Sequence, residues 1–280
     1  MHFLNNIRRH ILSIIYYIRK KTPVRIHRII GGKIKKTNFL KMLFGLPFGV
    51  IYSTHKKNYS RIIILKRKAN PSTINVLDTS ALDAYQEIFL EQAYEKYNKI
   101  KKGNVILDIG ANVGIFSIKA AKAVGDEGKV IAIEPEPKNI KILNENLKNF
   151  KNIIIIPKAV GNSSGKVNFL IGIHSGSHKI NSRIRKKSTE KIITVPIEKI
   201  DNLVRELNLE KVNFLKIDVE GWELEVLKGA ENSLDMIEFM AIASYHTKDE
   251  RKLITEFLDC HDFKFLNDRE FTYAWNKRFL

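Results

Sequence analysis

Residues 105–121 read VILDIGANVGIFSIKAA, a β-branched run followed at once by a glycine-containing turn and a helical stretch. The run ends at Ile109, and Gly110 permits a sharp turn that also lets a ligand approach the backbone closely. Gly114 opens the helical stretch, where close packing favours a residue without a side chain. A strand, a tight turn and a helix in this order predict the first unit of a parallel α/β sheet, with a ligand at the turn.

Strands and helices continue to alternate on the C-terminal side of this unit. The expected strands are residues 129–133, 153–156, 214–219 and 239–244, and the expected helices are residues 115–124, 138–150, 201–208, 222–232 and 250–259. We also expect a short strand at 61–68, a helix at 82–100, a hairpin-like pair at 167–171 and 192–197, and a last strand or hairpin at 263–279. We expect Asp201 to cap its helix. The pattern predicts an α/β fold with a Rossmann-like, doubly wound and mostly parallel sheet.

The net charge of +18 over 280 residues is concentrated at the N-terminus. Residues 1–77 contain 17 Lys and Arg and no acidic residue, whereas residues 78–280 contain 31 basic and 30 acidic residues. We therefore expect two parts: a basic amphipathic extension over residues 1–77, of helical and β character, and a larger domain over residues 78–280. The single cysteine, Cys260, excludes an intrachain disulfide and a multi-cysteine zinc site.

Apolar residues of the extension recur at helical spacing, at positions 4, 7, 11, 14 and 18, and a second apolar run covers residues 39–52. Both runs are shorter than the ~20 residues that span a bilayer. With their Lys and Arg they predict segments that lie on an anionic membrane surface, and a cytoplasmic protein that is peripheral at the membrane. Two alternatives stay open. The segments can pack on the protein or on a second subunit, or they can bind nucleic acid, which the placement of the aromatic residues makes the least favoured.

The turn after the first strand has the pattern D-x-G-x-N-x-G over residues 108–114, which differs from both the dinucleotide fingerprint and the phosphate loop. Asp108 precedes the turn, where an acid suits a zwitterionic ligand with an ammonium group better than it suits a pyrophosphate. Glu134 ends the second strand, where an acid can accept hydrogen bonds from both hydroxyls of a ribose. Together these residues favour S-adenosylmethionine over NAD as the ligand.

Four segments resemble the FkbM family of class I S-adenosylmethionine-dependent methyltransferases. They are VILDIGANVGIFSIKAA at 105–121, IAIEPEP at 131–137, KAVGNSSGKVNF at 158–169 and FLKIDVEGWELEVLKGA at 214–230, and the likeness extends over about residues 83–246. The resemblance implies an O-methyltransferase that acts on hydroxyls of sugars or other metabolites. The sequence departs from the family pattern at one position. Family members often carry a Glu shortly before a His, whereas here Ser244 precedes His246.

The resemblance also implies roles for individual residues. The methionine part of S-adenosylmethionine would lie among Asp108, Gly110, Asn112 and Gly114, the ribose on Glu134, the adenine beside Lys158 and Ala159, and the sulfonium methyl facing Asp218 and Glu220.

Methyl transfer to an alcohol requires that the protein align the hydroxyl with the methyl group and remove a proton as the new bond forms. Asp218, Glu220 and His246 are the candidate bases, and the same three side chains could hold a divalent cation that acidifies the hydroxyl. Glu220 has an alternative role as an acid favoured at a helix start, and His246 as a hydrogen-bonded structural residue.

The sequence therefore predicts an S-adenosylmethionine-dependent O-methyltransferase for a hydroxyl of a sugar, glycan or glycolipid. The basic loop at residues 172–191 suggests an acidic or phosphorylated acceptor if it acts as a lid, and an ordinary solvated loop remains the alternative. Two other functions stay open. One is an RNA methyltransferase that uses the basic extension to hold phosphates, and the other is a non-catalytic adapter that has kept cofactor binding.

Overall fold

A computed structural model describes residues 48–54, 60–66, 69–76, 80–172, 179–180 and 191–280. The expected helical face at residues 4–18 and most of the basic loop at 172–191 lie outside these residues. Within the described part of the chain, no helix has both the length and the apolar character needed to cross a membrane.

The N-terminal described residues form a three-stranded sheet of order β1-β2-β3. Its strands are β1 Phe48–Thr54, β2 Ser60–Lys66 and β3 Ala69–Val76. The strand expected at 61–68 is confirmed as β2. The domain boundary expected between residues 77 and 78 stays a prediction.

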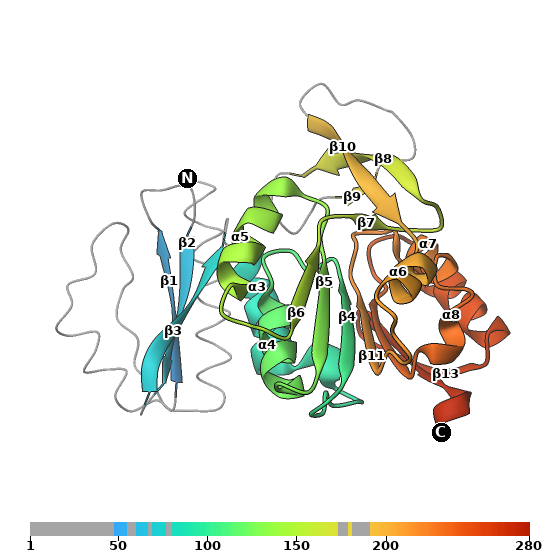
Figure 1. Ribbon diagram of the computed structural model, residues 1–280, viewed down its shortest axis with the longest axis horizontal. Helices are drawn as coiled ribbons and strands as arrows, with labels where there is room; N and C mark the ends of the chain where they lie inside the picture. The colour runs from blue at the N-terminus through green and yellow to red at the C-terminus, as the bar shows by residue number, and fades with distance from the viewer. Residues whose placement is uncertain (1–47, 55–59, 67–68, 77–79, 173–178, 181–190) are drawn as a thin grey trace. The chain divides into compact units, whose positions relative to one another are not determined.

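A seven-stranded sheet of order β13-β14-β12-β11-β4-β5-β6 forms the centre of the α/β body (Figure 1). Its strands are β4 Val105–Ile109, β5 Lys129–Ile133, β6 Ile153–Ile156, β11 Phe214–Ile217, β12 Phe239–Ala243, β13 Phe263–Asp268 and β14 Phe271–Asn276. The five strands from β12 to β6 are parallel, and β14 pairs with β12 in the antiparallel sense. The Rossmann-like, mostly parallel sheet is thus confirmed, and so is the C-terminal hairpin.

Helices cover both faces of this sheet, with α4 and α5 on one side and α6, α7 and α8 on the other (Figure 1). The helices are α4 Ile115–Val124, α5 Pro137–Leu147, α6 Ile200–Glu206, α7 Glu223–Lys228 and α8 Glu250–Cys260. Because both faces are covered, the central strands are buried on both sides, which explains why they read as continuous apolar runs. The strand order reverses between β4 and β11, and α/β sheets bind their ligands at such a point.

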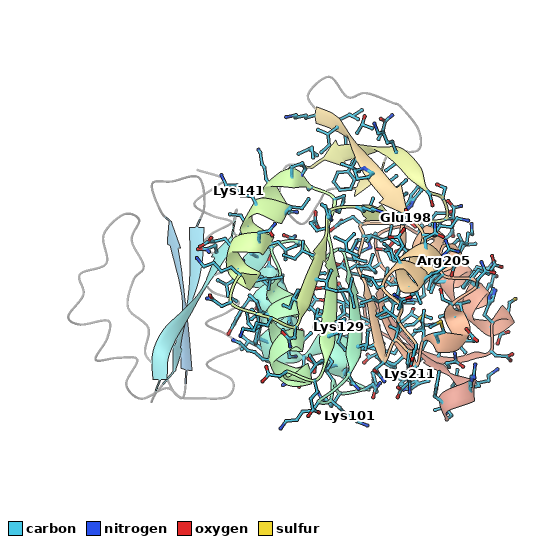
Figure 2. All side chains as sticks on the ribbon, viewed as in Figure 1. Lys101, Lys129, Lys141, Glu198, Arg205 and Lys211 are labelled. Carbon is cyan, nitrogen blue, oxygen red and sulfur yellow. The ribbon has the colours of Figure 1, made fainter. Side chains whose placement is uncertain are left out.

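A second sheet, of order β7-β10-β8-β9, contains β7 Ala159–Val160, β8 Gly165–Ile171, β9 Lys179–Ile180 and β10 Lys191–Glu198. β8 and β10 pair in the antiparallel sense, which confirms the hairpin-like pair expected at 167–171 and 192–197. Figure 2 shows the side chains of the described residues on the ribbon, including Glu198 at the end of β10 and Arg205 on α6.

Three local expectations were wrong. The helix expected at 82–100 is divided into α3 Ser80–Tyr85, a π-helix η1 Gln86–Glu91 and a 3₁₀ turn η2 Ala93–Glu95. The break between η1 and η2 comes at Gln92, which adopts the left-handed conformation with φ 53°. The helix expected at 222–232 is shorter, since α7 ends at Lys228. Asp201 lies within the first turn of α6 rather than capping it, and its carboxylate accepts hydrogen bonds from Asn232 and Ser233.

Candidate active site

A cavity of about 440 Å³ lies at the carboxyl ends of β4, β5 and β11. Among the residues singled out from the sequence, its lining includes Gly110, Asn112, Glu134, Lys158, Ala159, Asp218 and Glu220. The other three, Asp108, Gly114 and His246, are not part of the lining. The topology thus brings most of the candidate residues to one place, although these seven come from four separate segments of the chain.

The turn at Gly110 lies directly against the end of β11. Gly110 has φ +78°, and a Cβ atom built on it would lie 1.9 Å from the backbone oxygen of Asp218. The backbone N–H groups of Gly110 and Ala111 both donate to the carbonyl of Ile133 at 3.0 Å, which holds the turn over β5. Only glycine fits this position, because both the conformation and the space exclude a side chain.

Gly114 has a packing role in the structure. It precedes α4 with φ +88°, and a Cβ atom there would lie 2.7 Å from Cδ1 of Leu143 on α5. Gly114 therefore lets α4 start close to α5, behind the cavity.

Glu134 ends its strand with a buried carboxylate that the neighbouring backbone holds in place. Its Oε2 accepts from the backbone N–H of Asn112 at 2.9 Å. Its Oε1 accepts from the N–H of Glu136 at 3.0 Å and from the amide of Asn139 at 3.2 Å. Burial raises the pKa of Glu134 to about 7, although these hydrogen bonds act in the opposite direction. These hydrogen bonds thus fix the orientation of the carboxylate at the cavity wall. A fixed orientation is what an acceptor for two ligand hydroxyls requires.

Lys158 and Ala159 border the cavity at the end of β6 and the start of β7. The ammonium of Lys158 lies 3.3 Å from a carboxylate oxygen of Glu198, and Ala159 is buried and pairs with Ile197 in β10. The second sheet therefore contributes to the wall on which the resemblance places the adenine.

Asp108 does not reach the cavity. Its carboxylate is fully buried, accepts from Oγ of Ser117 at 2.5 Å and lies 3.1 Å from Nζ of Lys216. The acid therefore supports the turn from behind, whereas the resemblance placed it beside the methionine part of the ligand.

Lys216 is a site residue that the sequence reasoning missed. Its buried ammonium donates to the carbonyl of Gly110 at 2.8 Å and lies 3.9 Å from Oδ2 of Asp218. Burial alone would lower the pKa of Lys216, but the carboxylates of Asp108 and Asp218 outweigh it, so the pKa is raised and the side chain stays charged. A lysine within an otherwise apolar, buried strand was the signal in the sequence, because such a charge needs partners.

Asp218 follows β11 and presents its carboxylate to the cavity. Oδ2 accepts a hydrogen bond of 2.7 Å from the hydroxyl of Tyr94, a second residue that the sequence reasoning missed. The ring of Tyr94 is buried in edge-to-face contact with Phe116 and Phe271. Burial and the charge of Asp218 raise the pKa of Tyr94, so its hydroxyl stays protonated and acts as a donor. Asp218 keeps 28% of its side chain exposed and is therefore accessible to a ligand.

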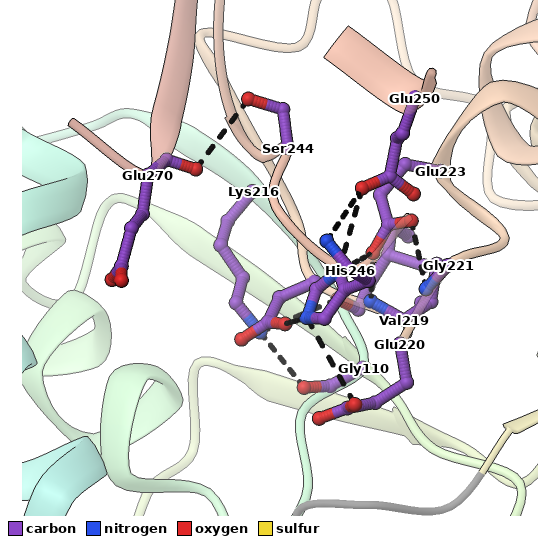
Figure 3. Close-up of polar contacts among 12 residues, drawn as sticks. Gly110, Lys216, Val219, Glu220, Gly221, Glu223, Ser244, His246, Glu250 and Glu270 are labelled. Atoms are coloured by element: carbon purple, nitrogen blue, oxygen red, sulfur yellow. Dashed lines mark hydrogen bonds and ion pairs between the residues drawn. The ribbon is translucent and has the colours of Figure 1, made fainter. Parts of the chain in front are cut away.

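A buried carboxylate, that of Glu223, holds the loop that follows β11 (Figure 3). Glu223 accepts from the backbone N–H groups of Val219 at 2.9 Å and Gly221 at 3.0 Å. Its Oε1 also lies 3.0 Å from Nδ1 of His246. Nε2 of the same imidazole lies 3.7 Å from Asp218 and 3.9 Å from Glu220. Glu223 therefore connects the loop to the histidine.

The carboxylates around His246 stabilise its protonated, cationic form. Burial acts to lower the pKa of His246, but the carboxylates of Glu223, Asp218 and Glu220 raise it to about 9. Glu250 accepts from the backbone N–H of His246 at 2.9 Å, and burial beside Glu223 raises its pKa to about 8. Near neutral pH, a protonated His246 cannot accept a proton, which leaves Asp218 and Glu220 as the candidate bases at the cavity.

The set of side chains expected to hold a divalent cation was Asp218, Glu220 and His246. The structure brings together a different set, Asp218, Glu223 and His246, whose ligand atoms all lie within 4.8 Å of one another. A nitrogen and two carboxylate oxygens suit several divalent ions. However, both oxygens of Glu223 already accept backbone N–H groups, and a cation would have to displace the proton of His246. The carboxylates of this cluster are therefore already balanced by backbone N–H groups and by the protonated His246. The divalent cation stays a prediction.

Comparison with known proteins relates this chain to methyltransferases. Residues 108–273 match the model of the Methyltransferase FkbM domain. The hexuronic acid methyltransferase AglP of Haloferax volcanii is 33% identical over an alignment of 176 residues that covers 60% of this chain and 66% of that protein. Methyltransferase sdnD of Sordaria araneosa is 24% identical over an alignment of 216 residues that covers 66% of this chain and 83% of that protein.

Two solved structures are also similar. The FkbM methyltransferase of Methylobacillus flagellatus has a TM-score of 0.49 at 18% identity, over 68% of this chain and 48% of that chain. Fibrillarin of Aeropyrum pernix in complex with S-adenosyl-L-methionine has a TM-score of 0.45 at 14% identity, over 81% of this chain and 98% of that chain. This chain thus spans slightly less than two thirds of the Haloferax relative and about half of the Methylobacillus chain.

Proposed function

The chain belongs to the FkbM methyltransferase family, and we propose that it transfers the methyl group of S-adenosylmethionine to a hydroxyl of a sugar, glycan or glycolipid. The family match over residues 108–273 supports the reaction class. The name of the Haloferax relative, a hexuronic acid methyltransferase, supports a sugar as the acceptor.

The observation that carries the proposal is the position of Asp218. Its carboxylate lines the cavity directly beside the turn at Gly110 and is held by Tyr94 and Lys216. A ligand that binds along this turn has its reacting end at Asp218. Glu220, which lines the cavity from the same loop, provides a second carboxylate.

The residues have distinct roles in the reaction. Glu134 would accept the ribose hydroxyls of S-adenosylmethionine, Lys158 and Ala159 would border its adenine, and Gly110 would let its methionine part approach the backbone. The bound cofactor would supply an electrophilic methyl group, which the acceptor oxygen would take over in line as the bond from that methyl group to sulfur breaks. The proton of the hydroxyl passes to Asp218, and Tyr94 and Lys216 hold this carboxylate in position.

The charge of the N-terminal extension supports a second part of the proposal, namely that the protein works at the cytoplasmic face of a membrane. Residues 1–77 carry 17 basic side chains and no acid. Flotation of the full chain with phosphatidylcholine vesicles, with and without phosphatidylglycerol, tests this part. Binding to the anionic vesicles alone supports it, and an equal distribution in both samples contradicts it. Binding to RNA that is lost at high salt would favour the alternative partner.

The first experiment on the activity is a calorimetric titration of S-adenosylmethionine into the full chain. We expect micromolar binding that Glu134→Ala weakens strongly, whereas Glu145→Gln, an exposed acid on α5, leaves it unchanged. Incubation with a glycan and lipid extract and radiolabelled S-adenosylmethionine then detects transfer. A folded protein that does not bind the cofactor would rule out the proposed function, and binding without any transfer would favour the adapter.

A further inference from the structure

The reacting end of the cavity has an excess of carboxyl groups. Glu87, on the π-helix η1, lines this end together with Asp218 and Glu220. Glu270 also acts electrostatically on Glu87. The acidic side chains that line this end therefore come from two separate elements, η1 and the loop after β11.

The two lysines of the cavity wall do not offset this excess for a ligand. The ammonium of Lys216 is committed to Asp108 at 3.1 Å and to the carbonyl of Gly110 at 2.8 Å. Lys158 lies 3.3 Å from Glu198. Both cationic side chains of the described lining, Lys158 and Lys216, thus already have carboxylate partners within the protein.

Glu87 itself has an open hydrogen-bonding position. Its Oε1 is buried and has no hydrogen-bond partner among the described residues. A buried carboxyl oxygen without a partner costs free energy unless a ligand supplies a donor. Burial, and after it the charge of Asp218, raises the pKa of Glu87 to about 8, so this position disfavours a negative charge even on Glu87 itself.

We propose that Glu87 determines acceptor specificity: the sugar unit that is methylated is neutral or carries an ammonium group, donates a hydrogen bond to Glu87, and carries no carboxylate. This inference rests on the proposed function and names the charge class of its acceptor. It separates this protein from the Haloferax relative, whose name specifies a hexuronic acid and hence a carboxylate-bearing sugar. It also differs from the expectation of an acidic acceptor based on the basic loop at 172–191, most of which lies outside the described residues.

The test uses one extract in two forms. Part of a glycan and lipid extract is treated with carbodiimide and methylamine, which converts carboxylates to neutral amides without adding a new hydroxyl group. The full chain is then incubated with each part and radiolabelled S-adenosylmethionine. We expect equal or higher methyl incorporation after treatment. Incorporation that is lost after treatment would overturn the inference but keep the proposed function, whereas no incorporation in either part, despite cofactor binding, would overturn both.

Two variants identify the residue. Glu87→Gln replaces the carboxyl group with an amide of the same size, and Glu91→Gln on the same π-helix is the matched control, because Glu91 is exposed and does not line the cavity. We expect kcat/KM for the extract to fall about tenfold in Glu87→Gln and to stay unchanged in Glu91→Gln. The calorimetric affinity for S-adenosylmethionine stays within about twofold in both. A tenfold loss of cofactor affinity in Glu87→Gln would instead assign Glu87 to the ammonium of the cofactor and overturn the inference.

Discussion

The backbone of Gly110 lies so close to Asp218 that a Cβ atom on the glycine would lie 1.9 Å from the carbonyl oxygen of the aspartate. The turn after β4 and the loop after β11 are therefore one unit, although 108 positions separate the two residues in the chain. Lys216 strengthens the connection, because its ammonium binds the carbonyl of Gly110 and lies near the carboxylate of Asp218. The binding and the reacting parts of the site thus cannot shift independently.

This contact gives a first prediction. Gly110→Ala forces the new side chain into the backbone of Asp218, and we expect it to lower the free energy of unfolding by about 3 kcal/mol or more and to abolish cofactor binding. Gly103→Ala is the matched control, because Gly103 has φ +77° but open space around its Cβ position. It should cost only about 1 kcal/mol, the strain of the conformation alone. Equal losses in the two variants, measured by urea denaturation, would contradict the contact.

A second prediction concerns the proton acceptor. Asp218→Asn keeps the shape of the side chain and removes its basicity, so we expect kcat to fall by about 10²- to 10⁴-fold. Tyr94→Phe removes one hydrogen bond to that carboxylate and should reduce kcat by about tenfold. Both variants should bind S-adenosylmethionine with nearly unchanged affinity. A loss of affinity without a loss of kcat would assign Asp218 to binding instead.

A third prediction concerns pH. The pKa of Glu134 is raised to about 7 in the folded protein, so its ionised form, which accepts the ribose hydroxyls, becomes dominant only above that pH. We expect cofactor affinity to increase as the pH rises from 6 to 8, by up to about tenfold per unit below the pKa. The folded state without ligand should lose stability from about pH 4.5 to 7, because it holds the proton more strongly than the unfolded chain does. A steep pH dependence that persists in Glu134→Gln would assign the effect to another group.

A fourth prediction concerns the carboxylate behind the loop. Glu223→Gln removes the charge that pairs with His246, so the pKa of this histidine should fall from about 9 toward its ordinary value, which NMR titration can follow. Loss of the buried charge pair should lower the free energy of unfolding by about 3 kcal/mol. This loss should be fully present below about pH 6.5 and should diminish as the pH rises through 9, where the wild-type histidine loses its proton.

The control for this variant is Glu225→Gln on the same helix. Glu225 forms an ion pair with Lys228 in solvent, which contributes less than about 1 kcal/mol. A histidine pKa that stays near 9 in Glu223→Gln would show that Asp218 and Glu220 alone hold the proton.

Local sequence was sufficient for most of the fold. The run at 105–121, the buried apolar strands and the amphipathic helices all lie within a few residues of their expected bounds. Periodicity and turn residues act over short distances, so they are visible in one dimension. The interruption of the helix expected at 82–100 was not visible, because Gln92 adopts a positive φ without being a glycine. The residues that follow Gln92 have distant partners, since the hydroxyl of Tyr273 donates to the carbonyl of Ala93 and the hydroxyl of Tyr94 donates to Asp218.

The sequence by itself determined the alternation of strands and helices, the glycine turn, the acid at the end of β5 and the reaction class that the family resemblance implies. Only the tertiary structure decided which candidate side chains face the cavity. It turned Asp108 toward Lys216, paired His246 with Glu223, and brought Tyr94 and Glu87 to Asp218 from a segment more than a hundred residues away. The physical reason is that neighbouring groups decide the protonation state and the hydrogen bonds of a buried charged side chain. Packing brings these neighbours together from distant parts of the sequence.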